Sequence, residues 1–131
     1  MEFETPAVTM HIGELAEKTG LSLRTIRHYD EVGLLKPTGR TDGGFRLYTQ
    51  GDFNRLMLIR RMKPLGFPLE EMTDLLRVID TLSRTNNTGT VDPNVRRELD
   101  TYITEADKRR AKLQEQLAMA DEFLKLLREQ F

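Results

Sequence analysis

Residues 20–33 read GLSLRTIRHYDEVG and predict the helix on which the interpretation of the chain depends. Ser22 is a residue type that caps helix N-termini and Gly33 is one that ends helices, so we expect a helix over about residues 23–32. A shorter amphipathic segment, residues 13–19, precedes it and predicts another helix. Two short helices joined by a glycine-containing turn are typical of a helix-turn-helix.

The second of these helices carries long polar side chains on one side. At 100° per residue Leu23 and Ile26 lie 60° apart, so we expect them to face the core. Polar groups at the centre of the opposite side, with an arginine and a tyrosine at its margins, suit a helix in the major groove of DNA. An amphipathic surface helix is the alternative for this segment alone. The candidate DNA contacts are Arg24, Thr25, Arg27, His28 and Tyr29.

The tripeptide Asp42-Gly43-Gly44 lies between two short extended runs and predicts a hairpin. Side chains alternate along a strand, so we expect Phe45 and Leu47 to face the body and Arg46 and Tyr48 to be exposed. We interpret the hairpin as a two-stranded wing. On it, Arg46 and Tyr48 are candidate contacts to phosphates or to the minor groove.

Two further helices are expected after the hairpin. Thr49 followed by Asp52 resembles a capping box and predicts a helix to about residue 63. The break Pro64-Leu65-Gly66-Phe67-Pro68 separates it from a fourth helix over about residues 69–80. The end of the third helix carries a further basic patch, formed by Arg60, Arg61 and Lys63.

The charge of the chain is concentrated in this region. Residues 20–63 contain nine cations and four anions, a local net charge of +5, whereas the whole chain has a net charge of −1. The rest of the chain therefore carries −6. A basic block on an otherwise acidic chain is typical of polyanion binding, although a solvated helical surface can also collect such a charge.

Residues 92–131 predict one long helix, which Asp92 caps and Pro93 begins. At 1.5 Å per residue it is roughly 57 Å long, more than a body of this size can cover. Its apolar residues recur at alternating spacings of four and three, which predicts a coiled coil interrupted by Arg110. We expect a homodimer; the alternative is a helix folded over its own N-terminal domain. The dimerisation residues are Leu99, Ile103, Ala106, Leu113, Leu117, Ala120, Leu124 and Leu127.

These elements predict a mainly α chain. We expect a winged helix-turn-helix DNA-binding domain over residues 1–80, a polar linker over residues 81–91 and a dimerisation helix over residues 92–131. With no cysteine and only two histidines, we expect no disulfide, metal site or cofactor. No long apolar stretch predicts a membrane span, and we expect a cytoplasmic protein. No catalytic motif accompanies the acidic residues, so we expect no enzyme.

The motifs together resemble the MerR (mercury-resistance regulator) family of transcriptional regulators. The resemblance covers roughly residues 9–80 in the right order, and the long helix matches the dimerisation element of the family. Because the chain lacks cysteine, sensing through thiolate-bound metal is unsupported, and we expect no large effector domain. The motifs that carry the resemblance are Ile12-Gly13-Glu14-Leu15-Ala16, Thr25-Ile26-Arg27-His28-Tyr29-Asp30, Gly33-Leu34-Leu35, Pro37, Gly44-Phe45-Arg46-Leu47-Tyr48 and Leu65-Gly66-Phe67.

The resemblance implies a function in transcription. It implies a dimer whose long helices pair antiparallel and which binds double-stranded DNA at an inverted repeat. It also implies that the protein bends and untwists promoter DNA so that RNA polymerase can read both promoter elements. An architectural, recombination or segregation protein with the same winged helix is the alternative, because function does not follow from fold alone.

Overall fold

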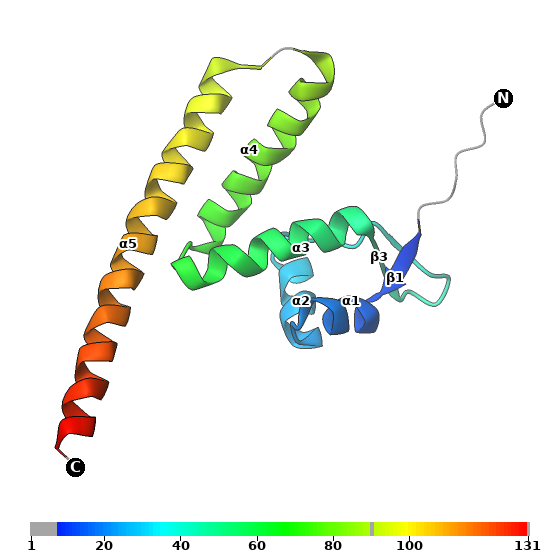
Figure 1. Ribbon diagram of the computed structural model, residues 1–131. Helices are drawn as coiled ribbons and strands as arrows, with labels where there is room; N and C mark the ends of the chain where they lie inside the picture. Colours follow the sequence, from blue (N-terminus) through cyan, green and yellow to red (C-terminus); the bar gives the residue numbers. More distant parts are fainter. Residues whose placement is uncertain (1–7, 90, 131) are drawn as a thin grey trace. The chain divides into compact units, whose positions relative to one another are not determined.

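The computed structural model describes residues 8–89 and 91–130, except for the side chains of residues 86–88. The chain divides into two compact units, Met1–Thr73 and Asp74–Phe131. The element order is β1 (Thr9–His11), α1 (Ile12–Thr19), α2 (Leu23–Glu31), β2 (Gly39–Arg40), β3 (Arg46–Thr49), α3 (Gln50–Met62), the 3-10 helix η1 (Lys63–Leu65), α4 (Leu69–Thr88) and α5 (Pro93–Glu129), as Figure 1 shows. The predicted mainly α fold with a helix-turn-helix, a wing and a long C-terminal helix is confirmed.

Local side-chain contacts start the helices where the sequence predicts. The Ser22 hydroxyl accepts a hydrogen bond of 3.0 Å from the backbone N–H of Thr25 at the start of α2. Thr49 and Asp52 form the predicted capping box at the start of α3, and the Asp92 carboxylate caps α5. Gly20 ends α1 with a positive φ of 71°, which L residues with a side chain rarely adopt.

The wing is part of a three-stranded antiparallel sheet rather than a two-stranded hairpin. The strand order is β1-β3-β2, so the central strand β3 pairs on both sides. In the β1–β3 register Met10 lies opposite Tyr48. The sequence prediction missed β1 because a strand of three residues is too short for an alternation of apolar and polar side chains to be visible.

The core of the first unit orients α2. Helix α1 packs against both α2 and α3, and also against β1 and β3. Leu15 of α1, Ile26 of α2, and Leu56 and Ile59 of α3 have no exposed surface. Burying each of these side chains contributes about 1.5–3 kcal/mol, so the rotation of α2 about its axis is held by packing. Its polar side is thereby presented to solvent.

The second unit is an antiparallel helical hairpin of α5 with the part of α4 that begins at Asp74 (Figure 1). The Tyr102 hydroxyl donates a hydrogen bond of 2.5 Å to the Asp74 carboxylate, and Arg77 pairs with both Asp74 and Glu98. The bond from Tyr102, together with Arg77, holds the pKa of Asp74 below its ordinary value. These polar contacts join the two helices.

The predicted linker is wrong for residues 81–88, because α4 continues to Thr88. The polar composition there does not prevent helix formation, since threonine hydroxyls can bond to carbonyls one turn back. Thr81 donates to the Arg77 carbonyl at 2.9 Å, and Thr85 donates to the Leu82 carbonyl at 3.0 Å. No helix among residues 8–89 and 91–130 is long and apolar enough to cross a bilayer.

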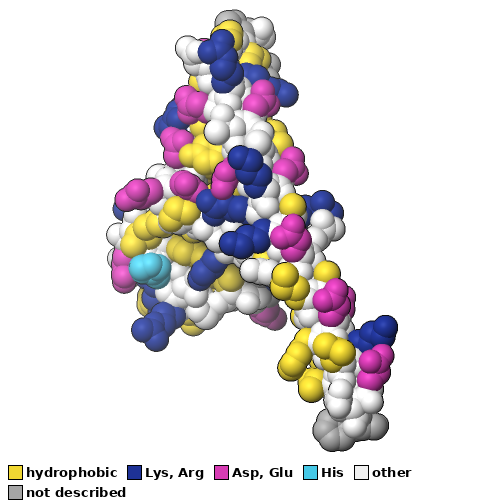
Figure 2. Space-filling model, turned by 90° about the vertical axis from the view of Figure 1, so that its left-hand side faces the viewer, with side chains coloured by type: hydrophobic (Ala, Val, Ile, Leu, Met, Phe, Trp, Pro, Cys, Tyr) yellow, Lys and Arg dark blue, Asp and Glu magenta, His cyan; other side chains and the backbone are white. Residues whose placement is uncertain are grey.

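Helix α5 extends far beyond the contacts of this hairpin. From residue 110 to residue 130 every side chain is exposed, including large apolar ones. Figure 2 shows these hydrophobic side chains on the C-terminal part of α5, at the bottom of the view. Val95 near the other end is the buried residue of α5. Within the second unit, the C-terminal half of α5 is therefore not covered by α4.

Candidate nucleic-acid interface

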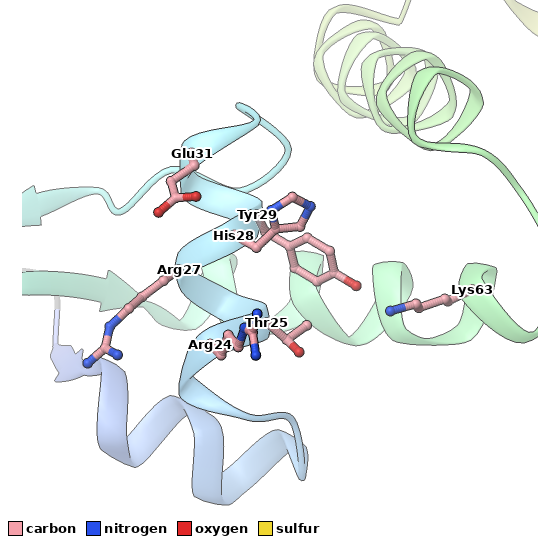
Figure 3. A pocket seen from close by; sticks show the side chains of 7 residues that line it. All are labelled: Arg24, Thr25, Arg27, His28, Tyr29, Glu31 and Lys63. Atoms are coloured by element: carbon pink, nitrogen blue, oxygen red, sulfur yellow. The ribbon is translucent and has the colours of Figure 1, made fainter.

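Helix α2 presents a cationic surface to solvent. Arg24, Arg27 and His28 are exposed, as predicted, while Thr25 is half-buried and its hydroxyl lies 2.8 Å from that of Ser22. This surface is hollowed into an open pocket of about 520 Å³. Figure 3 shows its lining residues, which are Arg24, Thr25, Arg27, His28, Tyr29, Glu31 and Lys63.

Lys63 comes to this surface from η1, directly after α3. Figure 3 shows its side chain extending toward the side of α2 that carries Thr25 and the hydroxyl end of Tyr29. Arg60 and Arg61 are exposed on the last turn of α3 but do not line the pocket, and Arg61 donates to the Met57 carbonyl at 3.5 Å. Of the predicted basic patch at the end of α3, Lys63 therefore lines the pocket together with α2, and Arg60 and Arg61 lie outside its lining.

Tyr29 lies on the core-facing side of α2. The prediction that it is exposed at the margin of the polar side is therefore wrong. It is 4% exposed, whereas Leu23, which was expected to face the core, is 39% exposed. The buried arc is centred between Ile26 and Tyr29 and also includes Asp30. The sequence prediction centred the core-facing arc between Leu23 and Ile26, which is too far toward Leu23. Only the edge of Tyr29 that lines the pocket remains available to a ligand.

Two side chains of the wing point in the direction opposite to the one predicted. Tyr48 has no exposed surface, and Phe45, expected to face the body, is 69% exposed. Tyr48 lies on the central strand β3 directly opposite Met10 of β1, and both side chains are buried, so they share the inward face of the sheet. A Tyr48 contact to phosphate is thereby ruled out in this fold. Burial raises the pKa of the Tyr48 hydroxyl.

A buried carboxylate that sequence reasoning did not single out joins the wing to α2. Asp30 is 8% exposed and accepts hydrogen bonds from Arg46 Nε at 2.7 Å and from Arg40 Nη2 at 3.4 Å. The bond to Asp30 is the main reason that the pKa of Arg46 is raised. Arg40 also donates to the Gly44 carbonyl at 3.0 Å. The acidic pair Asp30 and Glu31 at the end of a cationic helix was the available signal for this ion pair.

We expect Tyr48→Phe to leave stability unchanged or to raise it by about 1 kcal/mol, because a buried hydroxyl without a partner carries an unrecovered desolvation cost. Among the described side chains, the Tyr48 hydroxyl is the buried polar atom without a hydrogen-bond partner. Tyr102→Phe is the matched control and should lower stability, since it removes the bond to Asp74. Denaturant unfolding of both variants measures this, and a marked loss for Tyr48→Phe would show that the Tyr48 hydroxyl has a hydrogen-bond partner in the folded protein.

The predicted dimerisation residues share one face of α5. Leu99 and Ala106, near the hairpin contacts, are half-buried, and the remaining members are exposed. Three further large apolar residues, Met119, Phe123 and Leu126, are also exposed but lie outside the predicted seam. No cluster of three potential metal ligands occurs within the described part of the chain.

Comparison with known protein families gives two overlapping matches. Residues 10–78 match the family described as MerR HTH family regulatory protein. Residues 53–130 match the family described as MerR, DNA binding. Among curated proteins, the mercuric resistance operon regulatory protein of Bacillus cereus is 48% identical over 69 residues, which cover 53% of this chain and 52% of that protein. The chain thus spans about half the length of the curated relatives that it matches.

Solved structures extend the similarity over the long helix. A MerR-family transcriptional regulator from Bacillus cereus is 27% identical with a TM-score of 0.65, covering 93% of this chain and 79% of that one. HiNmlR, a MerR-family regulator lacking the sensor domain and solved bound to promoter DNA, is 25% identical with a TM-score of 0.65, covering 94% of this chain and 87% of that one. With both family descriptions matching more than half of its residues, the chain belongs to the MerR family of helix-turn-helix regulatory proteins.

Proposed function

We propose that this protein is a dimeric, sequence-specific transcriptional regulator that binds promoter DNA at an inverted repeat. The observation that carries the proposal is the cationic surface of α2, on which Arg24, Arg27 and His28 are exposed beside Lys63. A helix with this surface fits the major groove, where arginine can donate two hydrogen bonds to guanine. Phosphates on either side complement the positive charge.

The comparison with HiNmlR supports the same proposal. That regulator was solved bound to promoter DNA, and the similarity includes α5 as well as the wing. We infer that binding bends and untwists the promoter and so alters its use by RNA polymerase. The protein acts in the cytoplasm under this proposal, because that is where bacterial promoters are found.

The direct test is footprinting on the promoter region of the gene for this protein, combined with transcription from that promoter. We expect protection of two half-sites related by twofold symmetry, and a change in transcript level when the protein is added. Protection with an unchanged transcript level at every bound promoter would favour an architectural role. Failure to protect any inverted repeat would contradict the proposal.

Arg24→Ala is expected to weaken binding to the preferred site by about 10- to 100-fold and to relax its sequence preference, since a bidentate contact to a base discriminates by about 1–3 kcal/mol. Lys63→Ala should weaken binding to all sequences about equally and reduce the salt slope by about one. Arg97→Ala, which removes an exposed arginine from α5, is the control and should bind normally. Titration of specific and random duplexes at several salt concentrations distinguishes the three variants.

A further inference from the structure

His28 is one of the two histidines of the chain, and it lies on the cationic surface of α2. It is exposed and lines the pocket, whereas His11 lies on β1 and does not belong to the lining. Histidine is the side-chain type whose charge ordinarily changes between about pH 5 and pH 8. Among the side chains that line the pocket, His28 is the one of this type.

The charged groups around His28 are mainly positive. Arg24 and Arg27 line the same pocket from α2, and Lys63 lines it from η1. Figure 3 shows Arg27 and Lys63 on opposite sides of His28 in this view. Glu31 is the acidic member of the lining and follows His28 by three residues, which makes the two side chains neighbours on the helix. Three cations therefore oppose a further positive charge on the imidazole, and one carboxylate favours it.

The remaining surroundings of His28 change this balance little. The residue lies in the last turn of α2, where the partial negative charge of the helix C-terminus favours a cation. Its ring centroid lies 6.3 Å from that of Tyr29. Asp30 is buried, and its charge is balanced by Arg46 and Arg40 of the wing. The arginines and the lysine that line the pocket thus dominate the electrostatic potential at His28 in the free protein.

A DNA duplex reverses the sign of that potential. It carries one negative charge for about every 1.7 Å of its axis, and its phosphates pair with the cations that oppose the proton. We propose that His28 binds a DNA phosphate as the doubly protonated imidazolium, so that each subunit takes up a proton from solvent when it binds. The proposal rests on the DNA binding of the proposed function and adds to it a proton-linked contact.

The place of His28 along α2 favours a phosphate over a base as its ligand. The residues of a recognition helix that contact base edges lie toward its N-terminal end, which here carries Arg24 and Thr25. An imidazolium donates from both ring nitrogens, and both donors suit the oxygens of a phosphate. The neutral ring keeps a single donor. Because phosphates carry no sequence information, the contact should form on any duplex.

The proposal predicts that DNA affinity falls as the pH rises. Phosphates stabilise the imidazolium, so the complex keeps this proton to a higher pH than the free protein does. The contact is complete at a pH low enough to protonate both forms, and it is lost as the pH rises through the range in which the complex releases the proton. From about pH 6 to about pH 8 we expect a loss of roughly 10-fold for each half-site, on specific and random duplexes alike.

The test is titration of both duplexes at fixed ionic strength with two substitutions of His28. His28→Gln keeps a polar side chain that does not titrate, so it should bind at about pH 8 like the original protein and gain nothing at about pH 6. His28→Lys carries its charge at both values, so its affinity should be independent of pH and exceed that of the original protein at about pH 8. His11→Gln is the matched control, since His11 is exposed and its side chain does not cap α1. It should retain the full pH dependence.

A second measurement counts the protons in the original protein without any substitution. Calorimetry of DNA binding in two buffers of different ionisation enthalpy should show net proton uptake near pH 7. An absence of uptake overturns the proposal, and so does a pH dependence that survives in His28→Gln. A dependence confined to the specific duplex shows a contact to a base and overturns the assignment to phosphate. Failure to bind any duplex at any pH contradicts the proposed function, whereas binding that is independent of pH contradicts this inference alone.

Discussion

Replacing Leu117 with glutamate is expected to convert the dimer to a monomer and to weaken binding to an inverted repeat by at least about 100-fold. Leu117 is 63% exposed, so the substitution disturbs little of the packing within one chain. In the proposed dimer the two introduced carboxylates lie in the predicted seam of α5, where burying an unpaired charge costs several kcal/mol. Sedimentation and DNA titration measure the two losses.

Leu126→Glu is the matched control for this prediction. Leu126 is 57% exposed, lies on the same half of α5 and undergoes the same change from apolar to acidic, but it lies outside the seam. We expect this variant to remain a dimer and to bind DNA. If Leu117→Glu stays dimeric at micromolar concentration, the seam is not the dimer interface.

Asp30→Asn is expected to lower stability by about 2 kcal/mol and to weaken DNA binding by about tenfold. The substituted amide retains the shape of the side chain but lacks the charge that binds Arg46 Nε at 2.7 Å and Arg40 Nη2 at 3.4 Å. Charge-assisted hydrogen bonds of a largely buried carboxylate contribute about 1.5–3 kcal/mol. The wing then loses its fixed position relative to α2. Denaturant unfolding and DNA titration measure the two effects.

The neighbouring residue provides the control. Glu31→Gln makes the same change of net charge on the same helix, but Glu31 is exposed. We expect its stability to be unchanged and its DNA binding to be equal to or tighter than that of the original protein, because a negative charge is removed beside the pocket. Equal losses for Asp30→Asn and Glu31→Gln would show that net charge, rather than the ion pair, accounts for the effect.

The helix boundaries could be predicted because their determinants are local. The Ser22 hydroxyl, the Thr49–Asp52 capping box and the Asp92 carboxylate each act within three residues of their position. The exposed arginines of α2 followed from periodicity alone. The end of α4 was missed because threonine hydroxyls that bond to carbonyls one turn back make a polar segment compatible with helix.

Sequence alone determined the succession of elements, the exposed cations of α2 and the apolar stripe of α5, because spacing and capping depend on neighbours along the chain. Only the tertiary structure decided that Tyr48 and Tyr29 are buried and that Asp30 holds the wing. Those outcomes depend on β1 pairing with β3, and on α2 and the wing coming together. Burial depends on contacts between segments that are distant in the sequence. The spacing of residues within one segment gives no information about those contacts.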